Sequence, residues 1–178
     1  MREYLTQRLP YFFMATVVIA LDRGTKAMVE ASLSPWGSVS IIPGFFDLTY
    51  VRNPGGVFGI FKGLDAEWRG ILFTVVPVAA ILMIGAYAWK IPAGRRLTQG
   101  SLALILGGAV GNLIDRFRYG HVIDFLDFYW RDYHWPAFNV ADSAICVGVA
   151  VLMFETLFTG EGVAPVEATG HRAGGDSP

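Results

Sequence analysis

Carboxylate and amide side chains are concentrated at a few points of an otherwise apolar sequence. Asn112 and Asp115 are three residues apart, and so are Asn139 and Asp142. Residues three apart on a helix share a face, so each pair can point at a common site. Asp124 lies between the two pairs, within the apolar and aromatic run HVIDFLDFYW. A chain that returns from one helix into the next could therefore place Asp124 opposite Asp142.

Asp124 and Asp142 are suited to general acid–base catalysis. Two carboxylates that lie close together in a partly desolvated site do not both ionise readily, so one pKa rises and the pair shares a proton. The ionised carboxylate can take a proton from water while the protonated one polarises the scissile carbonyl of an amide. Such a dyad titrates as a unit, so the sequence does not assign the two roles. The chemistry requires no metal and no covalent intermediate.

These side chains have to be positioned by membrane-spanning helices. Four apolar stretches approach or reach the roughly 20 residues that a helix needs to cross the hydrocarbon core. They cover residues 10–28, 68–89, 97–114 and 137–159. The third is rich in Gly, Ala and Leu, and small residues let helix backbones approach closely in lipid. The sequence predicts a mostly α-helical membrane protein with four transmembrane helices.

Polar residues occur at matching ends of three of these helices. Asp22, Arg23 and Lys26 lie toward the end of the first helix, and the two Asn/Asp pairs lie at the end of the third and the start of the fourth. In a four-span topology all these ends face the same side of the membrane. Ionisable groups in spanning segments are costly and usually mark function, so the site is predicted to lie at this end.

Basic residues predict which side of the membrane this is. Lys90, Arg95 and Arg96 crowd the short connection between the second and third helices. Short connections rich in Lys and Arg are retained in the cytoplasm. Both termini are therefore predicted to be cytoplasmic, and the polar cluster is predicted to face the extracytoplasmic side.

Two segments differ in character from the helices. Residues 38–61, between the first and second helices, combine β-branched and aromatic residues with Pro-Gly and Gly-Gly turn signals, which predicts a small extracytoplasmic β-rich segment. Residues 160–178 are rich in Gly, Ala and Pro and have almost nothing to bury, which predicts a disordered cytoplasmic tail. The chain would then be one membrane domain, residues 1–159, followed by this tail.

Composition excludes several other classes of protein. The chain has 178 residues, of which 53% are hydrophobic and only 16% are charged, below the quarter or so typical of a soluble domain. A net charge of -1 gives no basic surface for nucleic acid, so no such partner is expected. The single cysteine, Cys146, excludes an intrachain disulfide framework and a Cys-rich zinc site. The three histidines lack the ligand spacing of a zincin, and no metal or cofactor is expected.

Four motifs resemble the signatures of lipoprotein signal peptidases (signal peptidase II), a family of membrane aspartyl proteases. They occur in the right order, are interleaved with the four apolar stretches, and extend over nearly the whole chain except the tail. The motifs are Asp22–Lys26, similar to D-x-x-[ST]-K; Asn53–Phe58, similar to N-x-G-x-x-F; Asn112–Phe125, similar to N-x-x-D-R…G-x-V-x-D-F; and Phe138–Ser143, similar to F-N-x-A-D-S.

The resemblance implies a role for each of these positions. Asp124 and Asp142 would form the catalytic dyad; Asn53, Asn112, Arg116 and Asn139 would bind substrate or orient the dyad; and Asp22, Lys26 and Asp115 would support the fold around it. The family resides in the bacterial plasma membrane and cleaves prolipoproteins just before a diacylglyceryl-modified cysteine. The implied partners are a diacylated prolipoprotein, membrane lipid and the inhibitor globomycin.

Simpler interpretations stay open for several residues. Asp22 could be a cap or an ordinary interfacial residue at a helix end, and Asp115, beside Arg116, could form ion pairs that hold helix ends together. Cys146 could be a thiol nucleophile with His121 or His134, although a small apolar packing role is favoured. The sequence lacks the G-x-S-G setting of a rhomboid serine protease and the G-x-G-D pattern of presenilin-like proteases.

Two functions from other classes also have to be weighed. In a small ion-coupled transporter the carboxylates would carry protons, but the chain has no internal repeat and its polar cluster is at one end rather than at the midplane. In a lipid-binding scaffold the charged cluster would bind head groups. Such a scaffold would keep its function when Asp124 and Asp142 are both changed to Asn.

Overall fold

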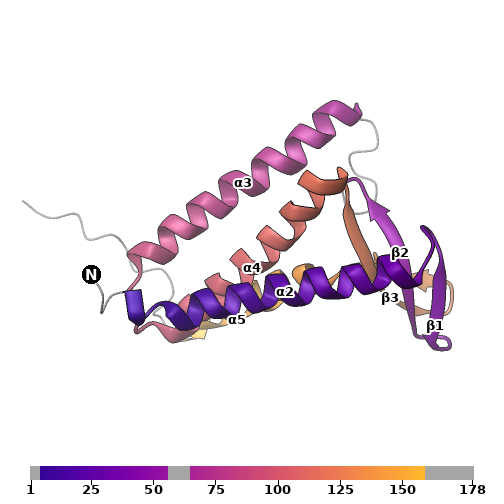
Figure 1. Ribbon diagram of the computed structural model, residues 1–178. Helices are drawn as coiled ribbons and strands as arrows, with labels where there is room; N and C mark the ends of the chain where they lie inside the picture. Colours follow the sequence, from indigo (N-terminus) through magenta and orange to yellow (C-terminus); the bar gives the residue numbers. More distant parts are fainter. Residues whose placement is uncertain (1–4, 56–64, 159–178) are drawn as a thin grey trace, which may run out of the picture.

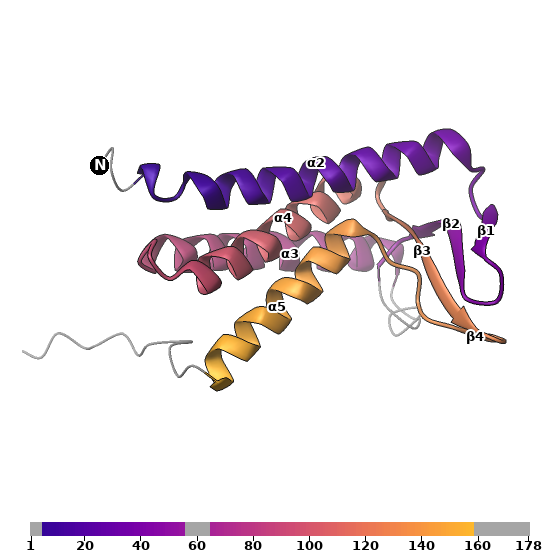
Figure 2. The same cartoon turned by 90° about the horizontal axis from the view of Figure 1, so that it is seen from below.

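The computed structural model describes residues 5–55 and 65–158 and consists of long helices with a small sheet at one end (Figure 1). In both Figure 1 and Figure 2 the N-terminal end of α2 and the C-terminal end of α5 lie away from the sheet. The elements, in chain order, are α2 (Leu9–Ser32), β1 (Ser38–Ile42), β2 (Phe46–Asn53), α3 (Ala66–Lys90), α4 (Arg96–Tyr119), β3 (Val122–Trp130), β4 (Tyr133–His134) and α5 (Val140–Phe158).

Three helices of the described residues are long and apolar enough to cross a membrane. They are Gly70–Lys90 within α3, Arg96–Tyr119 and Val140–Phe158. The chain is therefore a membrane protein, as its composition indicates. α2 is as long as these helices, but it carries Asp22, Arg23 and Lys26 in its second half. A fourth crossing by α2 stays a prediction.

α4 lies between the other helices and contacts α2, α3 and α5. Its glycines allow this close packing. A Cβ on Gly108 would collide with the carbonyl oxygen of Ala141 on α5, and a Cβ on Gly148 of α5 would lie 2.7 Å from the carbonyl oxygen of Ser101. The two helix backbones therefore meet where neither has a side chain. This explains why the small residues of the third apolar stretch matter.

The sheet is antiparallel throughout, with the strand order β1-β2-β3-β4. β1 and β2 confirm the strands expected in residues 38–61, although residues 56–61 lie outside the described part of the chain. β3 and β4 correct the prediction for residues 122–134, which were expected only to return the chain to the last helix. Ile123 and Phe125 of β3 pack with Val29 of α2 and Tyr50 of β2, so this strand joins the sheet to the helices.

A β-bulge sets which residues of β2 share a face with Asp124. Leu48 pairs with Leu126, but Val51 pairs with Asp124, so β2 has one extra residue between the two pairings. Directly opposite residues of an antiparallel pair share a face, and so do residues two apart on one strand. Asn53 therefore lies on the face of Asp124. Without the bulge it would lie on the opposite face.

The chain leaves the sheet for α5 through a single bridge. Phe138 pairs with Leu126: its amide donates to the Leu126 carbonyl at 3.1 Å, and its carbonyl accepts from the Leu126 amide at 2.8 Å. This bridge places Asn139 beside β3, and α5 begins at the next residue, Val140. The helix thus starts three residues later than the predicted 137.

α4 differs from its predicted bounds at the other end. It continues to Tyr119, five residues beyond the expected 114, so that Asp115 and Arg116 lie within the helix. It ends at Gly120, which has a left-handed backbone with φ of 73°. The predicted tail, residues 160–178, lies outside the described residues, and the domain boundary at 159 stays a prediction.

Candidate active site

Lys26 is the centre of an ion-pair network between α2 and α4. Its Nζ contacts Oδ2 of Asp22 at 2.8 Å, Oδ2 of Asp115 at 2.7 Å and Oδ1 of Asn112 at 3.1 Å. An ammonium group has three donors, so these three acceptors use all of them. Arg23 forms a second ion pair with Asp115. Lys26, Asp22 and Asp115 are fully buried, and each charge has a partner of opposite sign.

The two paired carboxylates also hold the segments that carry the dyad. Oδ1 of Asp22 accepts a hydrogen bond from the amide of Ala141 at 3.0 Å, in the first turn of α5. A carboxylate is favourable there because the first amides of a helix have no partner within it. Oδ2 of Asp115 accepts from the amide of Ile123 at 3.3 Å, next to Asp124. The network thus fixes the start of α5 and the start of β3 relative to α2 and α4.

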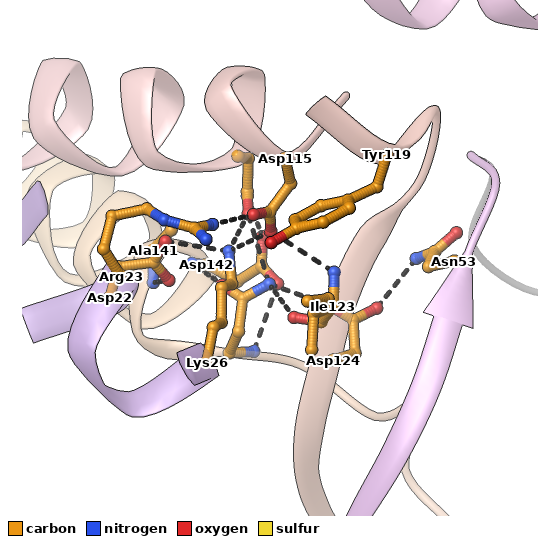
Figure 3. Close-up of polar contacts among 12 residues, drawn as sticks. Asp22, Arg23, Lys26, Asn53, Asp115, Tyr119, Ile123, Asp124, Ala141 and Asp142 are labelled. Carbon is orange, nitrogen blue, oxygen red and sulfur yellow. Dashed lines mark hydrogen bonds and ion pairs between the residues drawn. The ribbon is translucent and has the colours of Figure 1, made fainter. Parts of the chain in front are cut away.

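Asp124 is 2% exposed and receives one amide donor on each carboxylate oxygen. Nδ2 of Asn53 donates to Oδ2 at 2.9 Å, and Nδ2 of Asn139 donates to Oδ1 at 2.7 Å. Figure 3 shows Asn53 on β2 pointing toward Asp124 on β3. Both bonds are available because the bulge turns Asn53 to this face and the Phe138 bridge places Asn139 beside the strand.

Asp142 lies in the first turn of α5 and is also held by amides. Nδ2 of Asn112 donates to Oδ1 at 2.7 Å. Asn139 and Asp142 form a reciprocal cap: the amide of Asp142 donates to Oδ1 of Asn139 at 2.9 Å, and the amide of Asn139 donates to Oδ2 of Asp142 at 3.2 Å. Asn139 is therefore bonded to both Asp124 and Asp142, and it joins the two carboxylates directly.

The orientation of Asn112 depends on Lys26. Its Oδ1 accepts from Lys26 and, at 3.2 Å, from Nδ2 of Asn139, which leaves Nδ2 to donate to Asp142. The flipped amide would place its NH₂ group against an ammonium and its oxygen against a carboxylate. The buried cation thus acts on the dyad through a neutral amide.

The four carboxylates of the site divide into two kinds. Asp22 and Asp115 form ion pairs with Lys26 or Arg23. Asp124 and Asp142 receive only neutral N–H donors in the described part of the chain. Neutral donors stabilise a carboxylate less than an ion pair does, so two negative charges in this place are disfavoured.

The pKa of Asp124 shows the result of this environment. Burial raises the pKa of Asp124 to about 7, and the neighbouring Asp142 carboxylate contributes to the increase. The hydrogen bonds from Asn53 and Asn139 and the charge of Lys26 act in the opposite direction. A carboxyl group with this pKa exchanges a proton near neutral pH, as an acid–base catalyst must.

Arg116 is placed beside the dyad without a hydrogen bond or ion pair to it among the described residues. It interacts electrostatically with Asp124, Asp142 and Asp115. Its guanidinium lies 5.1 Å from the centre of the Phe73 ring on α3. Asp115 pairs with Lys26 and Arg23 of α2, so it forms ion pairs that hold helix ends together, as the sequence had suggested.

A thiol site receives no support from the geometry. Cys146 is exposed on α5. His134 is hydrogen-bonded to Asp127 at 2.9 Å, and the ring of His121 lies against Tyr119. No group of three or more His, Cys, Asp or Glu side chains within residues 5–55 and 65–158 is arranged to hold a metal ion.

The sequence matches the family model of signal peptidase (SPase) II over residues 14–158. The lipoprotein signal peptidase of Desulforapulum autotrophicum is 49% identical over 145 residues, which are 82% of this chain and 90% of the relative. That of Geobacter metallireducens is 45% identical over 147 residues, 83% of this chain and 90% of the relative. The chain belongs to the signal peptidase II family. It is an aspartic endopeptidase of the membrane.

Solved structures of bacterial membrane enzymes resemble the fold of this signal peptidase II family member. One is a bacterial membrane enzyme determined by the in meso method at 1.9 Å resolution. Its TM-score is 0.73 at 28% identity, covering 84% of this chain and 93% of that one. A second, at 2.3 Å resolution, has a TM-score of 0.72 at 27% identity and covers 88% of this chain and 94% of that one.

All nine site residues expected from the signal peptidase II motifs lie in one region. Asn53, Asn112 and Asn139 bond to the carboxylates of Asp124 and Asp142, whereas Asp22, Lys26 and Asp115 form the buried ion-pair network and Arg116 lies beside them. Arg23 belongs to the predicted polar cluster, but its pairing with Asp115 was not predicted. Phe73, the neighbour of Arg116, gave no signal in its apolar stretch.

Proposed function

We propose that this chain removes the signal peptide from diacylglyceryl-modified bacterial prolipoproteins by cleaving just before the lipidated cysteine. Water activated by Asp124 and Asp142 would hydrolyse the amide. The observation that supports this most is the position of Asn139, which bonds to both carboxylates while neither has a cationic partner among the described residues. Two acids that are joined in this way without an ion pair to either hold one proton between them.

The hydrolysis needs only this shared proton and one water. The ionised carboxylate removes a proton from water as its oxygen attacks the carbonyl carbon, and the protonated carboxyl donates its proton to the carbonyl oxygen. In the tetrahedral intermediate the C–N bond then breaks. The amine takes a proton from the carboxyl that deprotonated the water, and the intermediate's hydroxyl proton returns to the other carboxylate. The dyad is left with one proton, as at the start, and no cofactor takes part.

The substrate is consistent with a dyad at one end of the helices. A signal peptide is an apolar helix, and the two acyl chains of the modified cysteine hold the scissile bond near the membrane surface. Asp124 follows the end of α4, and Asp142 lies in the first turn of α5. We therefore propose that α2 makes a fourth crossing of the bacterial plasma membrane, that both termini are cytoplasmic, and that the dyad faces the extracytoplasmic side. Globomycin would compete for this site.

The test is cleavage of a diacylated prolipoprotein by the purified protein. Asp124→Asn and Asp142→Asn keep the size of each side chain but prevent proton exchange, so each should reduce cleavage by about 10²–10⁴-fold. Asp127→Asn is the matched control, because Asp127 is on the same strand and pairs with His134 instead of the dyad. This variant should cleave like the wild type, and chelators should have no effect on either protein.

Full cleavage by Asp124→Asn or by Asp142→Asn would refute the dyad. Failure of the wild-type protein to cleave any diacylated prolipoprotein would refute the substrate. If both Asp variants folded and retained an activity unrelated to proteolysis, the scaffold interpretation would gain support.

A further inference from the structure

The N-terminal part of α3 is connected to Asp124 by a chain of contacts that begins at Gly55. Gly55 has φ of 114°, a backbone conformation that favours glycine, and a Cβ at this position would collide with the ring of Phe73. The ring therefore lies directly on the backbone of the turn that follows β2. Phe73 is on α3, far from β2 in the sequence, so the contact is tertiary.

Gly55 in turn fixes the side chain of Asn53. The amide of Gly55 donates to Oδ1 of Asn53 at 2.9 Å. With its oxygen used in this way, Asn53 directs its Nδ2 toward Oδ2 of Asp124. In the flipped orientation an amide oxygen would face a carboxylate oxygen, and an NH₂ group would face an N–H. The Gly55 amide therefore makes Asn53 a donor to Asp124.

The donor from Asn53 affects the proton equilibrium of Asp124. It stabilises the ionised carboxylate and lowers its pKa, against the effects of burial and of Asp142. The other charged groups that act on Asp124 are Lys26 of α2 and Arg116 of α4. Lys26 is held by its own three acceptors, so a change at Gly55 reaches Asp124 through Asn53.

We propose that Phe73 is a positioning residue for the dyad: its ring holds the Gly55 turn, and the turn holds Asn53 as a hydrogen-bond donor to Asp124. The inference rests on the proposed proteolysis, since it concerns the same carboxylate. It assigns to Phe73 a part in catalysis that acts through Gly55 and Asn53.

The test is the pH dependence of kcat for Phe73→Ala, measured on the cleavage of a diacylated prolipoprotein. Loss of the ring frees the turn, Asn53 ceases to donate, and the ionised form of Asp124 is less stable. The acidic limb of the profile should move to higher pH, with a roughly tenfold loss of kcat at pH 6 and a smaller loss at pH 8. Val76→Ala is the control, because Val76 is an exposed residue of the same helix. An unchanged limb in a folded Phe73→Ala protein would overturn the proposal.

A second variant separates the two contacts of the ring. Phe73→Leu keeps an apolar side chain against Gly55 but removes the aromatic face on which Arg116 lies. If the packing on Gly55 matters, Phe73→Leu should retain most of the activity, and the acidic limb of its pH profile should lie where it does in the wild type. A leucine variant as impaired as the alanine variant would show that the contact with Arg116 is responsible, which contradicts the proposal.

A double-mutant cycle tests the route through Asn53. Asn53→Ala removes the donor outright, so adding Phe73→Ala should cost little more, and the two effects should be clearly non-additive. Additive effects would overturn the route. The proposed function is tested separately by wild-type cleavage and its loss in Asp124→Asn, so a failure of the Phe73 proposal is distinguishable from a failure of the dyad.

Discussion

Residues 5–55 and 65–158 contain two buried polar clusters, one at each end of the helices. The outer cluster, beside the sheet, contains Asp22, Lys26, Asn112, Asp115, Asp124, Asn139 and Asp142. The inner cluster, at the end away from the sheet, contains Arg8, Thr98, Gln99 and Glu155. Both are buried in a chain with few charges, and burial alone therefore does not separate a catalytic site from a structural one.

The inner cluster uses its polar groups to close helix ends. Arg8 donates to the carbonyl oxygens of Ala88 at 2.6 Å, Trp89 at 3.0 Å and Ile91 at 2.6 Å, where α3 ends. Gln99 of α4 donates to two of the same oxygens, those of Ala88 and Ile91. The last carbonyls of a helix lack partners within it, so these side chains replace what the helix cannot supply.

The two clusters differ in how negative charge is balanced. Glu155 accepts the hydroxyl of Thr98 at 2.8 Å on both oxygens and lies 4.0 Å from the guanidinium of Arg95. In the outer cluster Lys26 and Arg23 pair with Asp22 and Asp115, and the dyad is left with neutral donors. A surplus of carboxylates over cations, and not burial, thus distinguishes the end that is proposed to be catalytic.

The largest expected effect comes from replacing a carboxylate by the matching amide at each end of α5. Asp142→Asn should reduce cleavage by about 10²–10⁴-fold because it removes one acid of the dyad. Glu155→Gln should leave kcat nearly unchanged and lower the free energy of unfolding by about 1–2 kcal/mol, since Thr98 keeps an acceptor. Cleavage assays and thermal unfolding in detergent measure the two quantities. A large loss of kcat in Glu155→Gln would remove the distinction between the clusters.

The next effect concerns the cation of the outer cluster. Lys26→Ala leaves Asp22 without its cation and leaves Asp115 with Arg23 alone in a fully buried setting, so the free energy of unfolding should fall by about 3–5 kcal/mol. Thermal unfolding in detergent at pH 7 measures this. Arg23→Ala serves as the comparison and should cost less, because Asp115 keeps Lys26. Equal losses would show that Lys26 is not the centre of the network.

The pH dependence gives a smaller but more specific effect. Between the usual pKa of a carboxyl group, about 4, and the value of about 7 for Asp124, the folded protein binds more protons at this site than the unfolded chain. The contribution of Asp124 to stability is therefore lost as pH rises from about 4 to about 7.

Thermal unfolding of the wild type and of Asp124→Asn, measured from pH 5 to pH 8, checks this. Asp124→Asn should remove the corresponding part of the stability change. A wild-type stability that does not fall over this range relative to Asp124→Asn would contradict the raised pKa.

Sequence patterns predicted the helices and the composition of the outer cluster well. The helices were predictable from the apolar stretches and the small residues of the third helix, because a helix in lipid needs length and close contacts. The outer cluster was predictable from the motif resemblance and from the spacing of Asn112, Asp115, Asn139 and Asp142. The strands at residues 122–134 were missed because an aromatic run with buried polar residues lacks strict alternation.

The connections within the site could not be predicted for a different reason. The bulge in β2 decides whether Asn53 faces Asp124, and a shift of one residue in register leaves no trace in composition. The contact between Phe73 and Gly55 joins distant segments and uses a residue that looks like any other in an apolar helix. The inner cluster was also missed, since Arg8 and Glu155 find their partners only through tertiary packing.

The smallest expected effect is at Ser101, in the inner half of α4. Its hydroxyl is buried and has no hydrogen-bond partner among the described residues. A buried hydroxyl without a partner is unfavourable, so Ser101→Ala should leave kcat unchanged and raise the free energy of unfolding by up to about 1 kcal/mol. Thr98→Ala, which removes the donor to Glu155, is the matched change and should destabilise by about 1–2 kcal/mol. If Ser101→Ala reduced cleavage while unfolding at the wild-type temperature, the inner half of the helices would contribute to catalysis, and the division between the two ends would have to be abandoned.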